Sequence, residues 1–484
     1  MRPAPPSIGR EARWRRGRAV GDPGAMTRWP RRIRASMALT ATAMTIGAGA
    51  AAATEPPTEF WEVQDYATIL EVRGDGLQTY QTTDLSCLKA DAGTPAGPDR
   101  YNLPDDIYTL TRTTTPDRAT LRVDGSPGHR TLRRLTALPP RCTDPGEPSG
   151  FDVFWQTFRE NYPFFDAKGI DWNRVRDRYR ERALTAEHTG NDRELFATLS
   201  DMIAPLQDAH VAVIAPGIGR FATARPGTVA PTPEYDATIK SYIRQSDFGG
   251  VALTDYGRGR ISYADLPGHP DYGYLRLSGF SGFSDSDTFA DNSAELDRAL
   301  NDIFTPDRKA RLRGLILDLR VNGGGSDSLG LQLAARLTDA PYFAYAKQTR
   351  TTEPQPQQIR PAAPVFAGPV AILTGGSTVS AGETFTQAMI ERPAPTIRIG
   401  ASTQGVFSDV LERKFPGAHH DTWMFGLPNE LFRTADGRTF DGPGIPPQIP
   451  EPVFTDEEIG SHRDSAFDRA VRWLSDSEPV RPHR

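Results

Sequence analysis

Gly314-Leu-Ile-Leu-Asp-Leu-Arg-Val-Asn-Gly-Gly-Gly325 is the stretch that decides the fold. Its first half is a short, continuous apolar run, which is typical of a strand buried on both faces. The three glycines that follow allow a tight turn and a close approach of the backbone to a ligand. A helical pattern then extends to Leu337. The stretch therefore predicts a buried strand, a glycine-rich turn and a helix.

The same order recurs further along the chain. Val370-Ala-Ile-Leu373 is a second apolar run, followed by a turn at Gly375-Gly376, a helical pattern over 381–390 and a third run over 396–399. Strands that alternate with helices in this way indicate a sheet covered on both faces. We therefore predict an α/β domain over residues 221–476.

A helical period marks the segment before this domain. Apolar residues recur at helical spacing from Phe151 to Tyr162, a second helix is expected after Asp171, and a third follows an Asn191 cap. These patterns predict a helical bundle over residues 148–220. A capping box at Thr455 predicts one further helix near the end of the chain.

Residues 54–147 have short β-branched and aromatic runs broken by Gly, Pro and Asp, which predicts a small β domain. Cys87 and Cys142 are the only cysteines of the chain. In an exported protein such a pair favours a disulfide, which would stabilise the fold by about 4 kcal/mol in the chain-entropy model. The pattern assigns no function to this domain.

Residues 1–53 have the pattern of an export signal. Arginines precede a mildly apolar run over 35–46, and small residues follow as far as Ala53, so cleavage is expected near 50–53. Met26 is an alternative start. We expect an exported protein, located outside the cell, in a periplasm or in the cell envelope. An uncleaved signal would add a weak membrane association.

Charge and motif content exclude several functions. The formal net charge of the 484 residues is −5, and it becomes more negative once the arginine-rich signal is removed. An acidic body argues against nucleic acid as a partner. The sequence has no His-Glu-x-x-His, no cysteine cluster and no nucleotide-binding glycine motif. We therefore expect no metal and no other cofactor, and the sequence carries no signal for an oligomeric state.

Two side chains are candidates for chemistry. Ser380 lies just after the second strand, in Thr378-Val-Ser-Ala-Gly-Glu383. This is a capping box, so a structural role is one interpretation. The same position suits a nucleophile, because the Ala381 amide and the helix dipole favour an oxyanion. His210 lies at a helix–strand junction, where a histidine is most often structural, but a nucleophilic serine needs a base.

In order, these motifs resemble the tail-specific (C-terminal-processing) serine peptidases. The matching stretches are 318–325, 380–383, 400–405, 436–437 and 442–447. Tyr162-Pro-Phe-Phe165 and the Leu-x-Asp-x-His run that ends at His210 are similar to the branch related to tricorn protease and interphotoreceptor retinoid-binding protein. The resemblance covers roughly 150–474 and implies a ClpP/crotonase-like spiral of ββα units. Only about 60 residues separate His210 from the strand at Tyr272, so we expect no PDZ module.

The resemblance also implies roles for individual residues. Ser380 is then the nucleophile, and the amides of Ala381 and of Gly324 or Gly325 form the oxyanion hole. The Ser/Lys dyad of the processing peptidases is absent, because Val406 stands where their lysine would be.

The tricorn-like branch uses histidine as the base, and His210 fits that role. Its supporting serine is expected immediately before the histidine, but Ala209 stands there. Its supporting glutamate aligns with Asp441, whose side chain is one methylene shorter.

We therefore expect an exported serine peptidase that cleaves proteins or peptides through an acyl-enzyme. One alternative is a catalytically silent member that binds peptides or apolar ligands, which Ala209 and Asp441 favour. A second is a Ser/Lys enzyme that uses the displaced Lys414. A crotonase-type acyl-CoA enzyme fits poorly, because an export compartment lacks coenzyme A.

Overall fold

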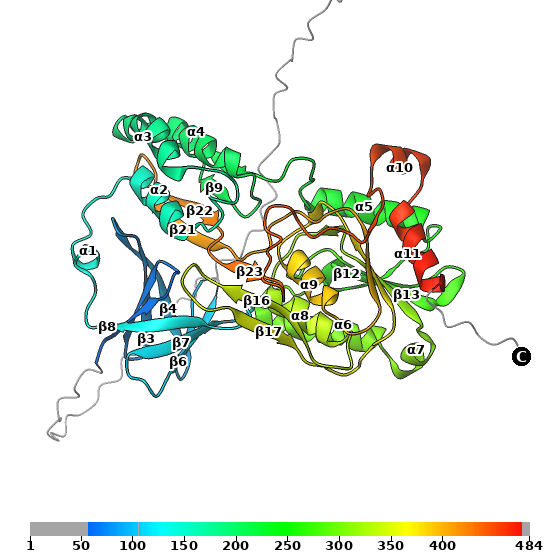
Figure 1. The fold of residues 1–484 in the computed structure, drawn as a ribbon. Helices are drawn as coiled ribbons and strands as arrows, with labels where there is room; N and C mark the ends of the chain where they lie inside the picture. Colours follow the sequence, from blue (N-terminus) through cyan, green and yellow to red (C-terminus); the bar gives the residue numbers. More distant parts are fainter. Residues whose placement is uncertain (1–56, 105, 477–484) are drawn as a thin grey trace, which may run out of the picture. The chain divides into compact units, whose positions relative to one another are not determined.

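The computed structural model describes residues 57–104 and 106–476 of the chain (Figure 1). The predicted export signal lies outside these residues. Within them, an N-terminal barrel is followed by three helices that cover a small sheet and then by an α/β core. Among the described helices, none has the length and apolar character needed to span a bilayer.

The predicted small β domain is a closed barrel of eight strands in sequence order. Neighbouring strands pair antiparallel, and β8 closes on β1. Closure removes the exposed edges that an open sheet of this size would have. Its strands are β1 (Glu59–Val63), β2 (Thr68–Arg73), β3 (Gly76–Thr82), β4 (Cys87–Gly97), β5 (Arg100–Asn102), β6 (Ile107–Arg112), β7 (Arg118–Val123) and β8 (Arg130–Leu135).

A disulfide attaches the barrel to the chain that leaves it. Cys87 is the first residue of β4, and it is bonded to Cys142 in the short helix α1 (Pro140–Thr143). The predicted disulfide is confirmed. It links residues 55 apart in the sequence, so it holds the exit segment against the barrel.

Three helices then form where the sequence predicts them: α2 (Gly150–Asn161), α3 (Trp172–His188) and α4 (Asp192–Ile203). The side chain of Ser149 caps α2, and that of Asn191 caps α4 by accepting from the Glu194 amide at 3.1 Å. A 3-10 turn, η1 (Ala204–Leu206), ends the segment.

These three helices pack on one another, as the sequence pattern predicts, and they have a further role. They cover a four-stranded sheet of order β10-β9-β22-β21 (Figure 1). Phe154 of α2 contacts Phe415 and Phe425, with ring centroids 5.8 and 4.9 Å apart. The sheet was not foreseen because its two hairpins lie about 200 residues apart in the chain: β9 (Ala212–Ala215) and β10 (Gly219–Ala222), then β21 (Leu411–Pro416) and β22 (Thr422–Leu427).

The core is a seven-stranded sheet, parallel from β13 to β24. In order across the sheet, the strands are β11 (Thr254–Tyr256), β12 (Ile261–Leu266), β13 (His269–Leu277), β14 (Gly314–Asp318), β18 (Val370–Thr374), β20 (Thr396–Gly400) and β24 (Ile449–Pro450). A 3-10 turn, η2 (Gly257–Gly259), joins β11 to β12. A separate sheet of order β17-β16-β23 is formed by β16 (Tyr342–Gln348), β17 (Gln355–Ile359) and β23 (Leu431–Arg433).

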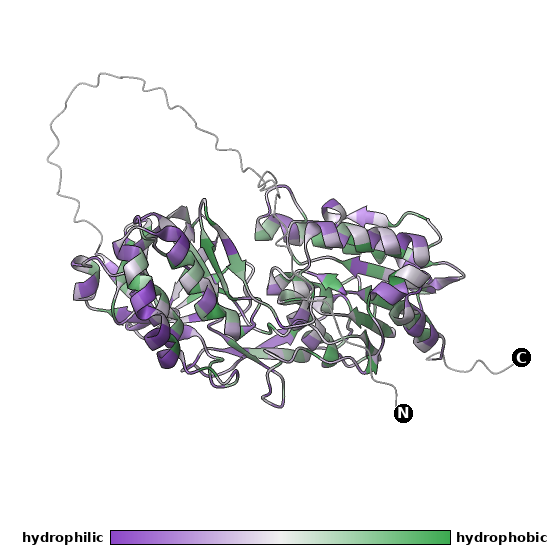
Figure 2. Ribbon diagram, turned by 90° about the horizontal axis from the view of Figure 1, so that it is seen from above, coloured by the Kyte–Doolittle hydropathy of each residue, from purple (hydrophilic) through white to green (hydrophobic). Residues whose placement is uncertain are grey.

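Helices cover both faces of the core sheet, as predicted. Leu315 and Leu317 of β14 pack with α6, α8 and α9, whereas Ile316 between them packs with α5 and α11. Figure 2 shows these central strands as largely hydrophobic, between helices of mixed character. The helices are α5 (Pro233–Ser246), α6 (Phe289–Ile303), α7 (Pro306–Arg311), α8 (Asp327–Ala335), α9 (Ala381–Ile390), α10 (Asp456–Ser461) and α11 (Ser465–Asp476).

The end of the chain differs from the prediction in one respect. Thr455 does cap a helix, but that helix is the short α10, and α11 is separate from it. His462 between them has a left-handed backbone with φ of 54°. A residue in that conformation ends a right-handed helix, so one predicted helix becomes two.

Candidate active site

The two turns that the sequence singled out lie side by side. β14 and β18 pair in parallel, so the turns that follow them leave the same edge of the sheet. Just beyond that edge, β15 (Val321–Asn322) pairs with β19 (Ser377–Thr378). The glycine-rich turn and Ser380 are therefore brought together at the carboxyl ends of parallel strands, where open α/β sheets bind their ligands.

Ser380 is half-buried and caps the start of α9. Its backbone has φ of 55° and ψ of −119°, a conformation that is rare outside glycine and typical of functional sites. The predicted capping box is present: the Ser380 amide donates to Glu383 Oε2 at 3.2 Å. The Glu383 amide in turn donates to the backbone carbonyl oxygen of Ser380 at 2.7 Å.

The Glu383 carboxylate fastens the start of α9 to the loop that carries Val406. Besides the Ser380 amide, it accepts hydrogen bonds from the Thr403 hydroxyl (2.6 Å), the Gly405 amide (2.8 Å) and the Val406 amide (2.8 Å). Burial raises the pKa of Glu383 to about 7, against the effect of these hydrogen bonds. One carboxylate oxygen thus joins the amides of Ser380 and Val406.

The glycine-rich turn lies directly against Ser380. A Cβ atom at Gly324, where φ is 80°, would stand 2.7 Å from Ser380 Cβ, so only glycine fits there. The Gly324 amide donates to the Asn322 side chain at 3.0 Å. Ala381 is the first residue of α9, so its amide has no partner within the helix. Among the three predicted oxyanion donors, this leaves Gly325 and Ala381 as the candidates.

His210 lies in the turn before β9, and its ring faces an unexpected partner. Its Nδ1 atom is 3.2 Å from Ser408 Oγ. Its backbone amide donates to Asp208 Oδ1 at 3.0 Å. Burial lowers the pKa of His210, although the charges of Asp208 and Asp409 oppose that shift. The ring is therefore neutral near pH 7, which is the state that a general base requires.

Asp441 reaches the histidine through Ser408. The Ser408 hydroxyl donates to Asp441 Oδ2 at 2.9 Å, and the aspartate is only 7 % exposed. Its other oxygen, Oδ1, has no partner among the described residues. Burial and the neighbouring Asp208 raise the pKa of Asp441 well above its usual range, while Lys168 and the Ser408 hydrogen bond lower it. The sequence reasoning placed the supporting serine before His210 and missed Ser408.

Comparison with known proteins matches two segments of the chain to family models. Residues 271–450 match the model of Peptidase family S41, and residues 148–204 match that of the Tricorn protease C1 domain. The first range holds Ser380, the glycine-rich turn, Ser408 and Asp441, in the arrangement described above. The segment that carries the candidate site is thus similar to peptidase family S41. The chain is a serine-type peptidase, a hydrolase whose substrates are proteins or peptides.

One solved structure supports the fold, and two others show weaker similarity. A putative peptidase from Parabacteroides merdae ATCC 43184 is 24% identical, with 69% of this chain and 98% of that chain covered and a TM-score of 0.55. Mature CPAF is 13% identical, with coverage of 69% and 98% and a TM-score of 0.49. The photosystem II D1 C-terminal processing protease is 16% identical, with coverage of 63% and 92% and a TM-score of 0.37. No curated protein matches the chain.

Residues of the segment that matches the Tricorn C1 model help to hold His210. The Tyr162 hydroxyl donates to Asp208 Oδ2 at 2.8 Å, and Lys168 Nζ lies 4.0 Å from the same oxygen. Asp208 in turn accepts from the His210 backbone. The aspartate thus positions the backbone of His210 and not its ring, which Ser408 contacts.

The predicted nucleophile and base, Ser380 and His210, are not hydrogen-bonded to each other: in the part of the chain that the structure describes, no hydrogen bond links the Ser380 hydroxyl to that histidine. Catalytic hydrogen bonds are often long in a free enzyme and tighten when substrate binds.

Within residues 57–104 and 106–476, no cluster of metal ligands occurs. Between β10 and β12 the described residues hold only α5, β11 and η2, with β11 paired to the core sheet, so they form no PDZ module there.

The displaced lysine has another role. Lys414 Nζ forms an ion pair with Asp91 Oδ1 of the barrel at 2.6 Å, and its backbone amide donates to Gln81. A lysine held in this way is engaged by the barrel. The geometry therefore gives no support to the Ser/Lys alternative.

Proposed function

We propose that the chain is an exported serine peptidase in which Ser380 is the nucleophile and His210 the base. Ser380 Oγ attacks the scissile carbonyl carbon while the Nε2 atom of His210 takes its proton. The imidazolium then gives that proton to the leaving amine, which departs as the acyl-enzyme forms. Water enters by the same base catalysis, the ester bond to Ser380 breaks, and the carboxylic product leaves.

The geometry around Ser380 carries this proposal. Its strained turn, its position at the start of α9 and its close contact with Gly324 are features that a simple helix cap does not require. The amides of Ala381 and Gly325 are the proposed donors to the tetrahedral oxyanion. One such donor is worth about 10²–10³-fold in kcat in a serine peptidase.

Ser408 and Asp441 are proposed to complete the site. With Nδ1 of His210 held by Ser408, the Nε2 atom is left to act on the nucleophile. Asp441, when ionised, stabilises the imidazolium through the intervening hydroxyl. An aspartate then suffices where the family has a glutamate, because the serine spans the remaining distance.

Export is part of the same proposal. The disulfide between Cys87 and Cys142 is of the kind that persists in oxidising compartments. The arginine-led apolar run within residues 1–53 has the composition of a signal. Mass spectrometry of the secreted protein would locate its first residue, and a mature start at Met1 would contradict cleavage.

A fluorophosphonate probe tests the catalytic assignment. We expect stoichiometric labelling at Ser380 at neutral pH, lost in Ser380→Ala and strongly slowed in His210→Ala. His188→Ala is the matched control, because His188 is exposed at the end of α3. Its labelling rate should equal that of the unmodified protein. A folded protein that takes no label would overturn the proposal and favour the silent, peptide-binding alternative.

A further inference from the structure

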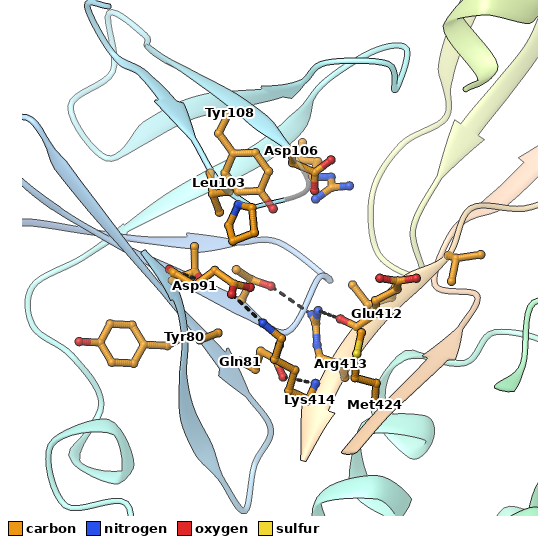
Figure 3. Close-up of a pocket in the computed structure, with 17 residues that line it drawn as sticks. Tyr80, Gln81, Asp91, Leu103, Asp106, Tyr108, Glu412, Arg413, Lys414 and Met424 are labelled. Carbon is orange, nitrogen blue, oxygen red and sulfur yellow. Dashed lines mark hydrogen bonds and ion pairs between the residues drawn. The ribbon is translucent and has the colours of Figure 1, made fainter. Parts of the chain in front are cut away.

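A pocket of about 310 Å³ lies between the barrel and β21, apart from the candidate active site (Figure 3). The barrel contributes residues of β2, β3, β4, β6 and β8, and the other wall is Val410 to Lys414 with Met424. Its size is in the range of pockets that hold small ligands. None of the residues proposed for catalysis lines it.

Arg413 is the unusual residue of this pocket. It is 7% exposed, yet its guanidinium bonds only to neutral oxygens: the carbonyls of Tyr66, Ala67 and Glu412, and the Thr68 hydroxyl. Its Nε atom has no acceptor among the described residues. Burial lowers the pKa of Arg413 to about 9. A buried cation normally has a carboxylate partner, because desolvation without one is costly.

Arg392 shows that neutral oxygens alone can hold a buried guanidinium. It bonds to the carbonyl oxygens of Leu337, Gly368 and Pro395 and to the Thr396 hydroxyl, but its Nε atom is among the donors used. Arg392 lines none of the described pockets. Arg413 therefore differs from it in having an unused donor and a pocket beside it.

Acids and bases are equal in number in the lining of the pocket, with Asp91, Asp106 and Glu412 against Arg130, Arg413 and Lys414. Lys414 and Asp91 form the ion pair drawn in Figure 3. The Arg130 guanidinium lies over the Tyr66 ring, 4.3 Å from its centroid, lines the same pocket and also interacts with the charges of Asp409 and Glu430. The remaining acids of the lining, Asp106 and Glu412, make contacts of their own.

The pocket is within reach of the catalytic groups along one strand. β21 is the edge strand of its sheet, and its outer side faces the barrel, where the Lys414 amide donates to Gln81. Ser408, which contacts His210, precedes Arg413 by five residues. An extended chain covers about 3.4 Å per residue, so the two are within about 17 Å. A peptide held at the pocket needs only a few residues to approach the active site.

We propose that this pocket binds a carboxylate group of a peptide, with Arg413 and Arg130 as the cationic partners. The carboxylate belongs to an acidic side chain or to the end of a peptide chain, which have the same chemistry. A guanidinium holds a carboxylate by paired, charge-assisted hydrogen bonds. The ligand's peptide nature follows from the family, whereas binding here does not require an active Ser380.

The test uses the full-length Ser380→Ala protein and three fluorescent hexapeptides that differ only at the last residue. One ends in alanine with a free carboxylate, one in alanine amide and one in glutamate amide. We expect at least one acidic peptide to bind about tenfold more tightly than the neutral amide by anisotropy, with a preference that weakens as salt is added. Tighter binding of the free acid alone identifies the chain end, and equal binding of both acids identifies any carboxylate. Equal affinity of all three overturns the proposal.

Two variants assign any preference to this pocket. Arg413→Met and Arg130→Gln should each reduce the tenfold ratio toward one, while Arg392→Met, the matched buried arginine, should leave it unchanged. If Arg413→Met does not fold, the Arg130→Gln variant still tests the assignment, because Arg130 is only half-buried. A ratio that persists in Arg130→Gln contradicts the assignment. Fluorophosphonate labelling of the unmodified protein is a separate readout, so failure of the pocket and failure of the catalytic proposal are distinguishable.

Discussion

His210 presents its Nδ1 atom to the hydroxyl of Ser408, 3.2 Å away, and not to a carboxylate. The histidine and the serine are 198 residues apart in the chain. Their contact spans two parts of the fold, since His210 precedes β9 while Ser408 precedes β21. The orientation of the proposed base thus depends on a hydroxyl group that itself donates to Asp441.

Removing the Ser408 hydroxyl should reduce catalysis more than stability. In Ser408→Ala the imidazole loses its orienting partner and its link to Asp441, so we expect kcat to fall about 10²-fold with a small change in KM. Steady-state kinetics on a peptide substrate would measure this. Ser262→Ala is the control, because Ser262 is equally buried but its hydroxyl donates to Asp255. An unchanged kcat in Ser408→Ala would show that the hydroxyl is not part of the machinery.

The acidic limb of the pH profile should move when Lys168 is replaced. Protonation of either His210 or Asp441 removes activity, so kcat/KM rises with pH through both pKa values. Lys168 lowers the pKa of Asp441, whereas burial, Asp208 and Glu383 raise it. Lys168→Met removes the lowering charge, and activity should therefore appear only at higher pH.

The measurement for Lys168→Met is kcat/KM across pH 4 to 9. Tyr162 and Asp208 also face this cluster, so Tyr162→Phe serves to test whether the shift depends on charge. It removes a neutral hydroxyl and should move the limb less. Lys89→Met, at an exposed barrel position, should leave the profile in place. An acidic limb of the kcat/KM profile that does not move in Lys168→Met would contradict electrostatic control by this lysine.

A methyl group at Gly324 should inactivate the enzyme. The added carbon would collide with Ser380 Cβ, 2.7 Å away, and with the Val379 carbonyl at 2.9 Å. We expect Gly324→Ala to slow fluorophosphonate labelling by about 10²-fold, as expected for a disturbed oxyanion site. Gly437→Ala is a close control: its φ is 81° against 80° at Gly324, and its Cβ would meet nothing within 4 Å. Equal labelling rates in the two variants would show that the contact between Gly324 and Ser380 does not affect the nucleophile.

The disulfide should contribute most of its stabilisation to the barrel. Replacing both Cys87 and Cys142 by serine removes a cross-link over 55 residues, which is worth about 4 kcal/mol in the chain-entropy model. Urea unfolding followed by Trp61 fluorescence, with the other tryptophans replaced, would measure the change. Reductant should lower the midpoint of the unmodified protein and leave that of the double variant unchanged. Equal midpoints for the two proteins without reductant would contradict this expectation.

Elements with local signals were predictable from sequence. α9 runs from Ala381 to Ile390 as the pattern predicts, and α3 and α4 begin directly after Asp171 and Asn191 as expected, because period and capping depend on residues a few positions apart. The strands of the barrel were harder to predict from sequence. β4 continues through Ala-Gly-Thr-Pro-Ala-Gly97, which has the composition of a loop but is held by its pairing with β3 and β5.

Some residues of the candidate site were predictable from sequence and others were not. Ser380 and the glycine-rich turn follow strands of one sheet, so their proximity could be inferred from the alternation of strands and helices. Ser408 has no such signal, since its partners come from distant segments. The one clue was a hydroxyl residue two positions after Val406, in the loop where the family has its lysine.

The pairing of β9 with β22, at Met424 and Ile214, has a consequence for how the enzyme can fail. The proposed base is carried by the turn before β9, whereas the nucleophile belongs to the core sheet, so the two are fixed to different sheets. Separation of β9 from β22 would divide the four-stranded sheet and move His210 away from Ser408, which would silence the enzyme while the core sheet stays intact. Heat inactivation would then occur at a lower temperature than melting of the core sheet. Loss of hydrolysis would therefore detect the separation of β9 from β22 before circular dichroism detects unfolding.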